Sequence, residues 1–446
     1  MKRTNDVTLS AEEAQHVSCI SSVHEQLKQA LFSPEWIKRF RLSEKAFTRS
    51  RDLPFHRLVT LLLNLRKGST EQELEDFFAT LEEQPQASVT PTPAAVCKAR
   101  KRLSAQVFAA LNCHAIETFC AGCGTPLWHG FRLLAVDGTT LRLPNNAALK
   151  GYFGAQPSGP ILARASMLYD IGHELVVDFQ LAAYCVSERE LAIAHLEAAR
   201  PEDLLLYDRG YPAFWLMAMH LQRGVEFCMR LPRESFAAAE PFWNSDATST
   251  LITLTPSPEQ ARDCRQQGLP TDPMRVRLVR VRLPDGETEV LATSVLEEAR
   301  LPARLFKALY HRRWTVEESY KRQKRWVEIE NLSGRSVLAV QQDVHAKILA
   351  LNLSSMVRVV AQLVASRRYA TRTHRYQVRW TSTLSAMKDT LVRLLIGTLQ
   401  ASANLLTSVI CKLSKAVEAV RPDRQFPRKN PGKLKVGFHA AYKRTA

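Results

Sequence analysis

Four side chains of different chemistry follow one another at helical spacing in the segment YHRRWTVEESYKRQK. They are Tyr310, Arg313, Glu317 and Lys324. At about 100° per residue they fall within a sector of roughly 60°, so one long exposed helix would carry all four on one face over roughly 21 Å. Glu318 points about 100° away from Glu317, so the two carboxylates are not interchangeable. A solvated face of mixed charge is the alternative interpretation.

Two aspartates lie in or at the ends of predicted strands. Asp137 lies in the apolar run FRLLAVDGTTLRLP, and Asp208 ends the apolar part of DLLLYDRGYPAF. A carboxylate in so apolar a strand is costly unless it is paired or bound to a metal. The predicted order of strand, hairpin, helix, strand, helix and strand makes the two strands neighbours and puts both aspartates at the edge where ligands usually bind. A hairpin corner at Asp137 and a strand-ending turn at Asp208 are the alternatives.

Together these residues have the chemistry of a metal-dependent site that cleaves phosphodiesters. Carboxylates from a sheet and a following helix can hold two Mg²⁺ ions about 3.5–4 Å apart, one to activate a water or 3′-hydroxyl and one to stabilise the leaving oxygen. Mg²⁺ prefers carboxylates and water to thiols. We therefore predict that Asp137, Asp208 and Glu317 are catalytic and bind Mg²⁺, with Mn²⁺ as a substitute. The basic and hydroxyl side chains of the same helix face could hold neighbouring phosphates.

A second candidate metal site contains cysteine and histidine. Cys113, His114, Cys120, Cys123 and His129 lie close in sequence around the run CAGC. Four such ligands could hold zinc, but a single C-x-x-C is a weak signal, and no second C-x-x-C or H-x3-H follows at finger spacing. Buried thiols that bind no metal are the favoured interpretation.

Basic residues outnumber acidic ones, with 61 Lys and Arg against 44 Asp and Glu and a net charge of +17. This surplus indicates a polyanionic partner, because neutralising phosphates releases counterions. The basic residues are spread over several segments rather than one amphipathic helix, which favours DNA over a membrane. The first residues lack the apolar core of a signal peptide, the apolar runs are short, and nine cysteines are too few for a disulfide scaffold. We expect a cytoplasmic, nucleoid-associated protein that does not enter a membrane.

Three segments could contact DNA. A helix after the turn TPTPAAV carries four basic residues, the strand run MRVRLVRVRL carries four arginines, and RRYATRTHRYQVRW interleaves arginines with aromatic rings. The residues are Lys98, Arg100, Lys101 and Arg102; Arg275, Arg277, Arg280 and Arg282; and Arg367, Arg368, Arg372, Arg375 and Arg379. For the first segment a solvated basic face is an equally good interpretation. The tail RPDRQFPRKNPGKLKVGFHAAYKR is expected to be an extended basic arm.

The pattern of predicted helices and strands divides the chain into five parts. They are a helical DNA-binding region (1–125), the first part of an α/β catalytic core (126–235), a β-rich insertion (236–305), the second part of the core with the glutamate helix (306–355), and a C-terminal helical region with the basic arm (356–446).

The spacing Tyr310-x2-Arg313-x3-Glu317-x6-Lys324 resembles the tyrosine–arginine–glutamate–lysine signature of bacterial insertion-sequence transposases of the IS-four type. The runs AVDGTT and YDRGY are similar to the two aspartate motifs of that family, which form the DDE triad with the glutamate. The resemblance covers roughly residues 50–440, and the four-residue helix signature is its specific part.

The resemblance implies a ribonuclease H-like mixed sheet with a β-rich insertion between the second aspartate and the glutamate. It also implies Mg²⁺-dependent cleavage of double-stranded DNA at terminal inverted repeats, often through a DNA hairpin, and strand transfer into target DNA by a homodimer. In relatives the tyrosine, arginine and lysine contact phosphates near the cleavage site, which implies that role for Tyr310, Arg313 and Lys324. Arg230 is a further candidate for such a contact. Some relatives hold a flipped base on an insertion-domain tryptophan, and Trp243 is the one tryptophan in the predicted insertion.

Two other functions stay open. A ribonuclease H-like nuclease, such as a repair or resolving enzyme, would explain the acids and the charge but not the long basic flanks. An inactive relative could bind DNA with its basic helices alone, although the intact Asp137, Asp208 and Glu317 count against it.

Overall fold

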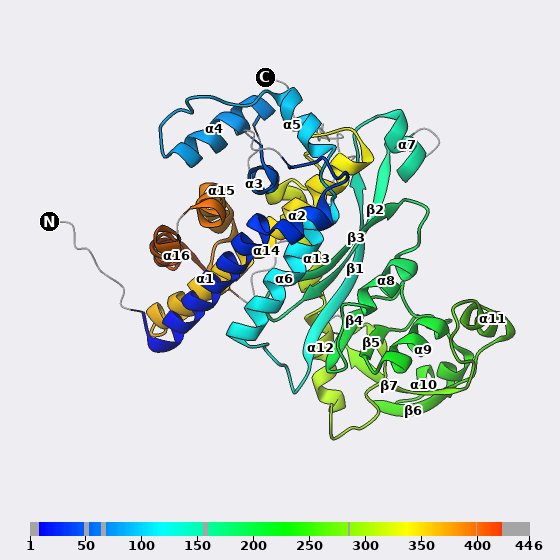
Figure 1. Cartoon of the computed structure of the whole chain (residues 1–446). Helices are drawn as coiled ribbons and strands as arrows, with labels where there is room; N and C mark the ends of the chain where they lie inside the picture. Colours follow the sequence, from blue (N-terminus) through cyan, green and yellow to red (C-terminus); the bar gives the residue numbers. More distant parts are fainter. Residues whose placement is uncertain are drawn as a thin grey trace. The chain divides into compact units, whose positions relative to one another are not determined.

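The structure is a computed structural model, drawn in Figure 1, and it describes residues 9–48, 53–63, 68–154, 159–283, 286–397 and 399–421. The chain divides into two compact units. The helical unit contains Met1–Gly124, Leu141–Leu162 and Arg322–Ala446, and the sheet unit contains Thr125–Thr140 and Ala163–Lys321. The five-part division stays a prediction. The tail after residue 421, where we expect a basic arm, lies outside the described residues.

A mixed sheet of eight strands forms the core of the sheet unit. The strands are β1 (Arg132–Arg142), β2 (Leu162–Asp170), β3 (Leu175–Ala183), β4 (Asp203–Tyr207), β5 (Glu226–Arg230), β6 (Ser249–Leu254), β7 (Met274–Arg282) and β8 (Thr288–Thr293). Their order is β3-β2-β1-β4-β5-β8-β7-β6; β1, β4 and β5 are parallel, and the pairs from β5 to β6 are antiparallel. The predicted fold class is confirmed: α/β, with a ribonuclease H-like mixed sheet, a β-rich insertion and helical regions before and after it.

The central strands form where the sequence has short, unbroken apolar runs. All five residues of β4 and the first five of β1 are buried. Strands covered on both faces lack the polar alternation of a half-exposed sheet, which explains the runs RLLAV and DLLLY. The insertion strands continue this sheet, since β8 pairs with β5 through Cys228 and Thr293. The β-rich insertion is therefore an extension of the same sheet.

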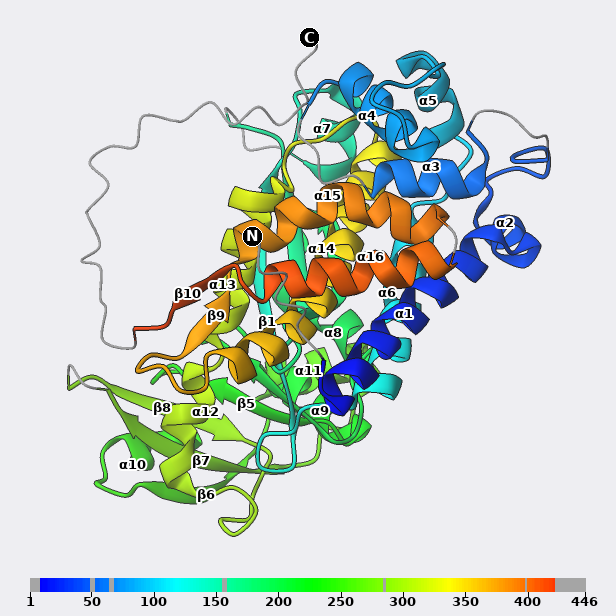
Figure 2. The ribbon, with the colours of Figure 1, turned by 90° about the vertical axis from the view of Figure 1, so that its left-hand side faces the viewer.

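Helices cover both faces of this sheet. α8 (Glu188–Leu196) and α9 (Phe214–Arg223) lie on one face, and α12 (Phe306–His311) lies on the other, as the two views in Figures 1 and 2 agree. α8 begins at Ser187, whose hydroxyl and the Glu190 side chain form a capping box. This cap starts the helix directly after the hairpin of β2 and β3, at the sheet edge where β1 and β4 end.

The single long helix predicted from Tyr310 to Lys324 is wrong. The chain forms α12, a turn, α13 (Trp314–Arg322) and one π-helical stretch at Gln323–Val327. At the turn Arg313 N–H bonds the carbonyl of Tyr310, three residues back, and not that of Leu309. Tyr310 and Arg313 are also buried rather than exposed. The turn brings the Arg313 side chain inward, where it meets carboxylates described below.

The helical unit contains the remaining long helices. They are α1 (Ala11–Phe32), α2 (Pro34–Phe40), α3 (Phe55–Leu62), α4 (Thr70–Glu82), α5 (Pro93–Arg100), α6 (Gln106–Cys123), α7 (Ala147–Phe153), α14 (Val337–Arg368), α15 (Trp380–Ile396) and α16 (Leu399–Leu413). α14 contacts α1, α6, α15 and α16, and α15 and α16 lie side by side in Figure 2. By length and composition α14 could cross a membrane, but 83% of its most apolar window is buried in the protein. It is the core helix of this unit.

Candidate active site

The register of β1 and β4 brings the two predicted aspartates together. The parallel pairing runs from Arg132 opposite Asp203 to Ala135 opposite Leu206. Continued by two residues, the same register sets Asp137 opposite Asp208 at one edge of the sheet. The predicted neighbourhood of the two strands is therefore confirmed.

Each aspartate accepts a hydrogen bond from a glycine close to it in sequence. Gly138 N–H donates to Asp137 Oδ1 at 3.0 Å, and Gly210 N–H donates to Asp208 Oδ1 at 2.8 Å. The turn expected as the alternative is present at Asp208, but the hairpin corner expected at Asp137 is not, because β1 continues through Asp137 and Gly138. The two hydrogen bonds use one oxygen of each carboxylate, and among the described residues the other oxygen has no hydrogen-bond partner. Both side chains are partly exposed, so the free oxygens can meet a ligand.

The three acids act on one another electrostatically. Burial, with a smaller effect of the negative charges of Asp208 and Glu317, raises the pKa of Asp137 to about 7, although the Arg313 guanidinium and the Gly138 N–H lower it. Like charges shift a pKa in this way only when they lie close together. Asp137, Asp208 and Glu317 therefore form one acidic cluster in the sheet unit.

Arg313 is the cation of this cluster. It pairs with Glu317, with an N···O distance of 2.9 Å, and its side chain is 8% exposed against 31% for the glutamate. Its guanidinium also lies over the rings of Tyr310 and Trp314, 5.6 and 5.3 Å from their centroids. Arg313 Nε is buried without a hydrogen-bond partner in the described structure. Glu318 is exposed and pairs with Lys321, so the two glutamates face different surroundings.

Tyr310 anchors α12 to the sheet beneath the cluster. Its hydroxyl donates to the carbonyl oxygen of Tyr207 at 3.2 Å, the residue before Asp208. Burial raises the pKa of Tyr310 well above its usual value, so the hydroxyl keeps its proton. In this arrangement Tyr310 packs inside the unit.

A chain of hydrogen bonds behind Asp137 was not predicted from the sequence. The Asp137 carbonyl accepts from Tyr320 Oη at 2.8 Å and from Ser166 Oγ at 3.4 Å. Ser166 Oγ in turn meets His195 Nε2 at 2.9 Å, and His195 Nδ1 meets Asp178 Oδ2 at 2.7 Å. The histidine and the serine are fully buried, so these groups hold the strand and cannot reach a substrate. A histidine within the apolar run LAIAHL was the one available signal.

The other predicted DNA contacts do not join this cluster. Arg230, at the end of β5, pairs with Glu287 and Glu289 at 3.1 and 3.0 Å. Lys324 belongs to the helical unit, where burial lowers its pKa and Glu330 raises it. Arg375 and Arg379 are exposed in the same unit, on either side of strand β9 (Tyr376–Val378). Trp243 is partly buried against the core of the sheet unit.

Three arginines predicted to face DNA are instead structural. Arg277 is 2% exposed, pairs with Glu298 and donates to the Leu301 carbonyl at 2.7 Å. Arg280 donates to the Phe242 carbonyl and lies over its ring. Arg100 is buried and bonded to Gln342, Ser333 and Asp343. Each arginine bonds with groups that lie outside its own sequence segment. The spacing of residues within the segment therefore could not predict that these arginines are structural.

The cluster fits Mg²⁺ by donor type, since it offers carboxylates with unused oxygens and an excess of negative charge. In the part of the chain that the structure describes, no three His, Cys, Asp or Glu side chains converge closely enough to hold an ion. The acids would have to turn toward a common point, and Glu317 would have to release Arg313. The same finding is against the cysteine–histidine zinc site. There, a hydrogen bond with Cys19 raises the pKa of Cys123.

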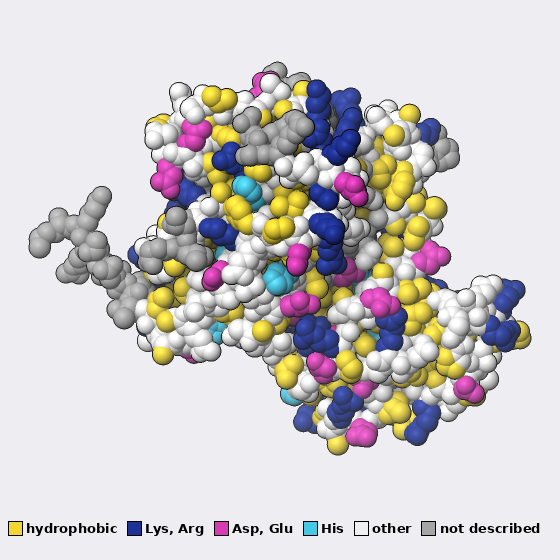
Figure 3. Space-filling view, viewed as in Figure 1, with side chains coloured by type: hydrophobic (Ala, Val, Ile, Leu, Met, Phe, Trp, Pro, Cys, Tyr) yellow, Lys and Arg dark blue, Asp and Glu magenta, His cyan; other side chains and the backbone are white. Residues whose placement is uncertain are grey.

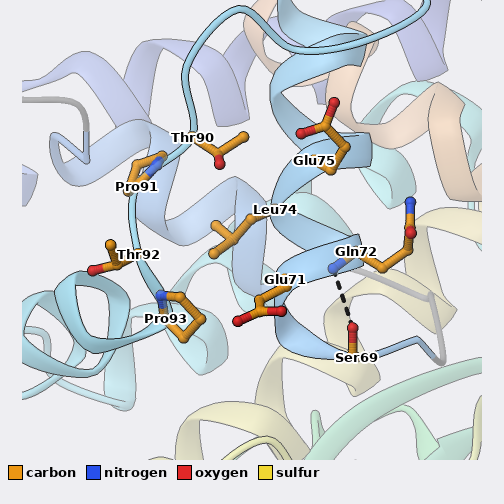
Figure 4. Close-up of a pocket in the computed structure, with 9 residues that line it drawn as sticks. All are labelled: Ser69, Glu71, Gln72, Leu74, Glu75, Thr90, Pro91, Thr92 and Pro93. Atoms are coloured by element: carbon orange, nitrogen blue, oxygen red, sulfur yellow. Dashed lines mark hydrogen bonds between the residues drawn. The ribbon is translucent and has the colours of Figure 1, made fainter. Parts of the chain in front are cut away.

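Two cavities of the helical unit differ in charge. One, of about 500 Å³, lies between α4 and the segment before α5, and the described residues that line it include Glu71 and Glu75 but no basic residue (Figure 4). The other, of about 800 Å³, is lined by Lys45, Lys98 and Arg102, with no acidic residue among its described lining. Figure 3 shows Lys and Arg side chains gathered over α5. Only the second cavity has the charge that a phosphate requires.

Comparisons with known proteins identify the family of the chain. Residues 128–353, which include all three acids, match the family model described as "Transposase DDE domain", and residues 24–113 match "Insertion element 4 transposase N-terminal". The chain is 26% identical to the transposase InsG for insertion sequence element IS4 of Escherichia coli (strain K12), over 331 residues, 72% of this chain and 73% of the relative.

Two further proteins are similar over shorter or more divergent stretches. The putative transposase InsZ of the same organism is 28% identical over 120 residues, 25% of this chain and 40% of the relative. A solved structure of the piggyBac transposase in a synaptic complex with hairpin DNA is 11% identical, with a TM-score of 0.42, covering 90% of this chain and 87% of that one.

Proposed function

Since the chain belongs to the family of insertion-sequence transposases with a DDE domain, we propose that Asp137, Asp208 and Glu317 are its catalytic residues and bind two Mg²⁺ ions. The observation that carries this proposal is the register of β1 and β4, which sets Asp137 opposite Asp208. Arg313, paired with Glu317, lowers the pKa of Asp137, while Asp208 and Glu317 raise it, which supports the closeness of the three acids. Three carboxylates with one guanidinium leave a surplus of negative charge that divalent cations can neutralise. When bound, the ions activate the attacking oxygen and stabilise the leaving one.

The chain's own residues prepare the site for DNA. The N–H groups of Gly138 and Gly210 hold one oxygen of each aspartate, and the other oxygen has no partner among the described residues. Arg313 pairs with Glu317. If Glu317 bound an ion instead, the guanidinium would be released to bind a DNA phosphate. Tyr310 holds α12 against β4, which keeps Arg313 next to the acids.

Other basic residues bind the DNA backbone away from the acids. Lys324, Arg375 and Arg379 supply cations from the helical unit, and Arg230 supplies one from β5 when it leaves its two glutamates. The cavity lined by Lys45, Lys98 and Arg102 gives the N-terminal helices a place for a phosphate. Together with the net charge of +17, these residues support salt-sensitive binding of double-stranded DNA.

The reaction in this proposal is cut-and-paste transposition. The chain cleaves at the terminal inverted repeats of its element and transfers the strands into target DNA, as a homodimer in the cytoplasm. The match to a transposase whose name includes an insertion sequence supports this substrate. A nuclease of general specificity would cleave DNA with or without element ends, and an inactive relative would bind DNA and leave it intact.

Purified protein with duplex DNA carrying one element end, in Mg²⁺ or Mn²⁺, tests the proposal. We expect nicking at the end, strand-transfer products when target DNA is added, and no reaction with a duplex of scrambled end sequence. Asp137→Ala, Asp208→Ala and Glu317→Ala should bind the DNA but not cut it, whereas Glu318→Ala should keep most activity. Cleavage by any of the first three at the native rate would refute the assignment of the acids.

A further inference from the structure

Tyr320 places a buried hydroxyl on the main chain of Asp137. The hydroxyl donates to the Asp137 carbonyl oxygen at 2.8 Å, and the side chain is 7% exposed. Burial raises the pKa of Tyr320 well above its usual value, so the hydroxyl keeps the proton that it donates. The Met167 main chain, in β2, hydrogen-bonds the same hydroxyl. Since β1 and β2 are neighbours in the sheet, Tyr320 joins two adjacent strands at Asp137.

The Asp137 carbonyl and the Asp137 carboxylate are linked through one peptide plane. The peptide bond between Asp137 and Gly138 is planar, so its C=O and its N–H turn together. The N–H of this plane, which belongs to Gly138, donates to Asp137 Oδ1 at 3.0 Å. A donor that fixes the carbonyl therefore also fixes the N–H, and through it the direction of the carboxylate.

The helix that carries Tyr320 also carries Glu317. The two residues lie three positions apart in α13, so they are neighbours on successive turns of this helix. A hydroxyl that ties α13 to β1 therefore limits how far the glutamate can move from the strand of Asp137. One hydrogen bond thus acts on two of the three proposed ligands.

A second hydroxyl near the same carbonyl does not replace Tyr320. Ser166 Oγ lies 3.4 Å from the Asp137 carbonyl oxygen and 2.9 Å from His195 Nε2. A serine hydroxyl has one proton to donate, and the contact with the carbonyl is the longer of the two. The donor on which the Asp137 carbonyl mainly depends is therefore Tyr320.

We propose that Tyr320 is a positioning residue for the reaction: it holds the peptide plane after Asp137, and with it the direction in which the carboxylate meets a divalent cation. Because the hydroxyl is buried, it acts through Asp137 and not on the substrate. Mg²⁺ demands near-ideal octahedral geometry, so a ligand that turns away from its place weakens the site. The inference rests on the proposed function, since it requires Asp137 to be a ligand.

The competing explanation is that Tyr320 only stabilises the fold. Thr293 supplies a matched control, because its hydroxyl is fully buried and donates to a strand carbonyl of the same sheet, that of Phe227, at 2.6 Å. Loss of either hydroxyl removes one hydrogen bond to a strand and should lower the melting temperature. Only the loss of the Tyr320 hydroxyl should change how the protein uses metal.

Single-turnover cleavage of end-containing DNA by the full chain separates the two explanations. Tyr320→Phe should bind the DNA with native affinity but cut it about 10- to 100-fold more slowly in Mg²⁺. The loss should be smaller in Mn²⁺, which is less strict than Mg²⁺ about the geometry of its ligands. Thr293→Val should lose stability and keep the native rate in both metals. Each variant is assayed at a temperature at which its melting curve shows it to be folded.

A native Mg²⁺ rate in folded Tyr320→Phe would overturn the inference, as would equal losses in Mg²⁺ and Mn²⁺ or the same loss in Thr293→Val. If Tyr320→Phe does not fold, Tyr320→Met fills the space without a hydroxyl and should show the same slow cleavage in Mg²⁺. A native rate in that variant would be equally fatal. Asp137→Ala distinguishes the two levels of the proposal. Native cleavage by Asp137→Ala rejects the proposed function itself, whereas no cleavage by Asp137→Ala with a native rate in Tyr320→Phe rejects only the positioning role.

Discussion

The stretch in which β1 and β4 pair has charged residues at its start and just beyond its end, and these two ends differ in how the charges are balanced. At the start, Arg132 and Asp203 face each other in the register, almost fully buried, and are joined by two hydrogen bonds of 2.6 and 2.7 Å. Further along the same two strands lie Asp137 and Asp208, which are partly exposed and have no basic partner at hydrogen-bonding distance among the described residues.

The difference shows how one parallel register serves two purposes. At the buried end each charge has its opposite, which a low-dielectric interior requires. At the open end Asp137 and Glu317 share Arg313, and Asp208 adds a third carboxylate, so the cluster lacks positive charge in the absence of cations. The buried end therefore contributes to stability, and the open end provides the proposed metal site. Variants at the two ends should accordingly affect different properties of the protein.

The largest expected effect is on cleavage, at the open end. Asp208→Asn keeps the size of the side chain but removes its charge, and we expect cleavage of end-containing DNA to fall at least about 10³-fold, since metal ligation contributes several kcal/mol to transition-state stabilisation. The melting temperature should stay within a few degrees of native. Single-turnover cleavage and circular dichroism measure the two quantities. A variant that cuts within tenfold of the native rate would contradict the role of the aspartate.

At the buried end the expected effect is on stability. Arg132→Met leaves Asp203 buried without its partner, which should cost about 3–5 kcal/mol of unfolding free energy in a urea titration. The double variant Arg132→Met with Asp203→Leu removes both charges and should recover much of the loss. If the double variant is no more stable than the single one, the unpaired charge is not the cause.

A smaller effect should appear in the pH dependence of stability without metal. Because the pKa of Asp137 in the folded chain is about 7, above that of an unfolded aspartate, the folded state holds an extra proton between about pH 4 and 7. Stability therefore falls as pH rises through this window. Asp137→Asn does not titrate, so it should be more stable than native at pH 8 by up to about 4 kcal/mol and equal to it near pH 4.

Melting curves in EDTA across this pH range test the prediction, and Mg²⁺ supplies its control. Saturating Mg²⁺ should stabilise the native chain at pH 8 and not Asp137→Asn, because only the former binds the ion. Parallel pH profiles for the two proteins would show that Asp137 titrates as an ordinary aspartate.

The smallest effect concerns a single phosphate contact. Lys324→Ala should weaken binding of end-containing DNA about equally for all sequences and lower the slope of log affinity against log salt by about one. Arg325, exposed beside it, supplies a matched control, since Arg325→Ala tests a cation that the helix signature does not include. An unchanged slope for Lys324→Ala would remove the lysine from the DNA interface.

The acids and the strands that carry them could be predicted because their signals are local. Apolar runs such as DLLLY mark strands by themselves, and Asp137 and Asp208 stand out against them. The broken helix could not be predicted in this way. No Gly or Pro marks the turn at Arg313, which arises because the guanidinium turns inward to Glu317 and Asp137.

Long-range partners explain the remaining errors. Arg100 and Arg277 lie in segments that suggest DNA contacts, yet each is buried by groups elsewhere in the chain, such as Asp343 and Glu298. Sequence spacing identifies candidate residues by their chemical type, but the fold determines which charged side chains pair with one another.

Replacement of Asp137 by cysteine tests the metal site most directly. Mn²⁺ accepts a sulfur ligand more readily than Mg²⁺ does. We expect Asp137→Cys to bind end-containing DNA normally, to cut none of it in Mg²⁺, and to regain cleavage in Mn²⁺. Cleavage by this variant in Mg²⁺ at the native rate would contradict a metal-binding role for Asp137.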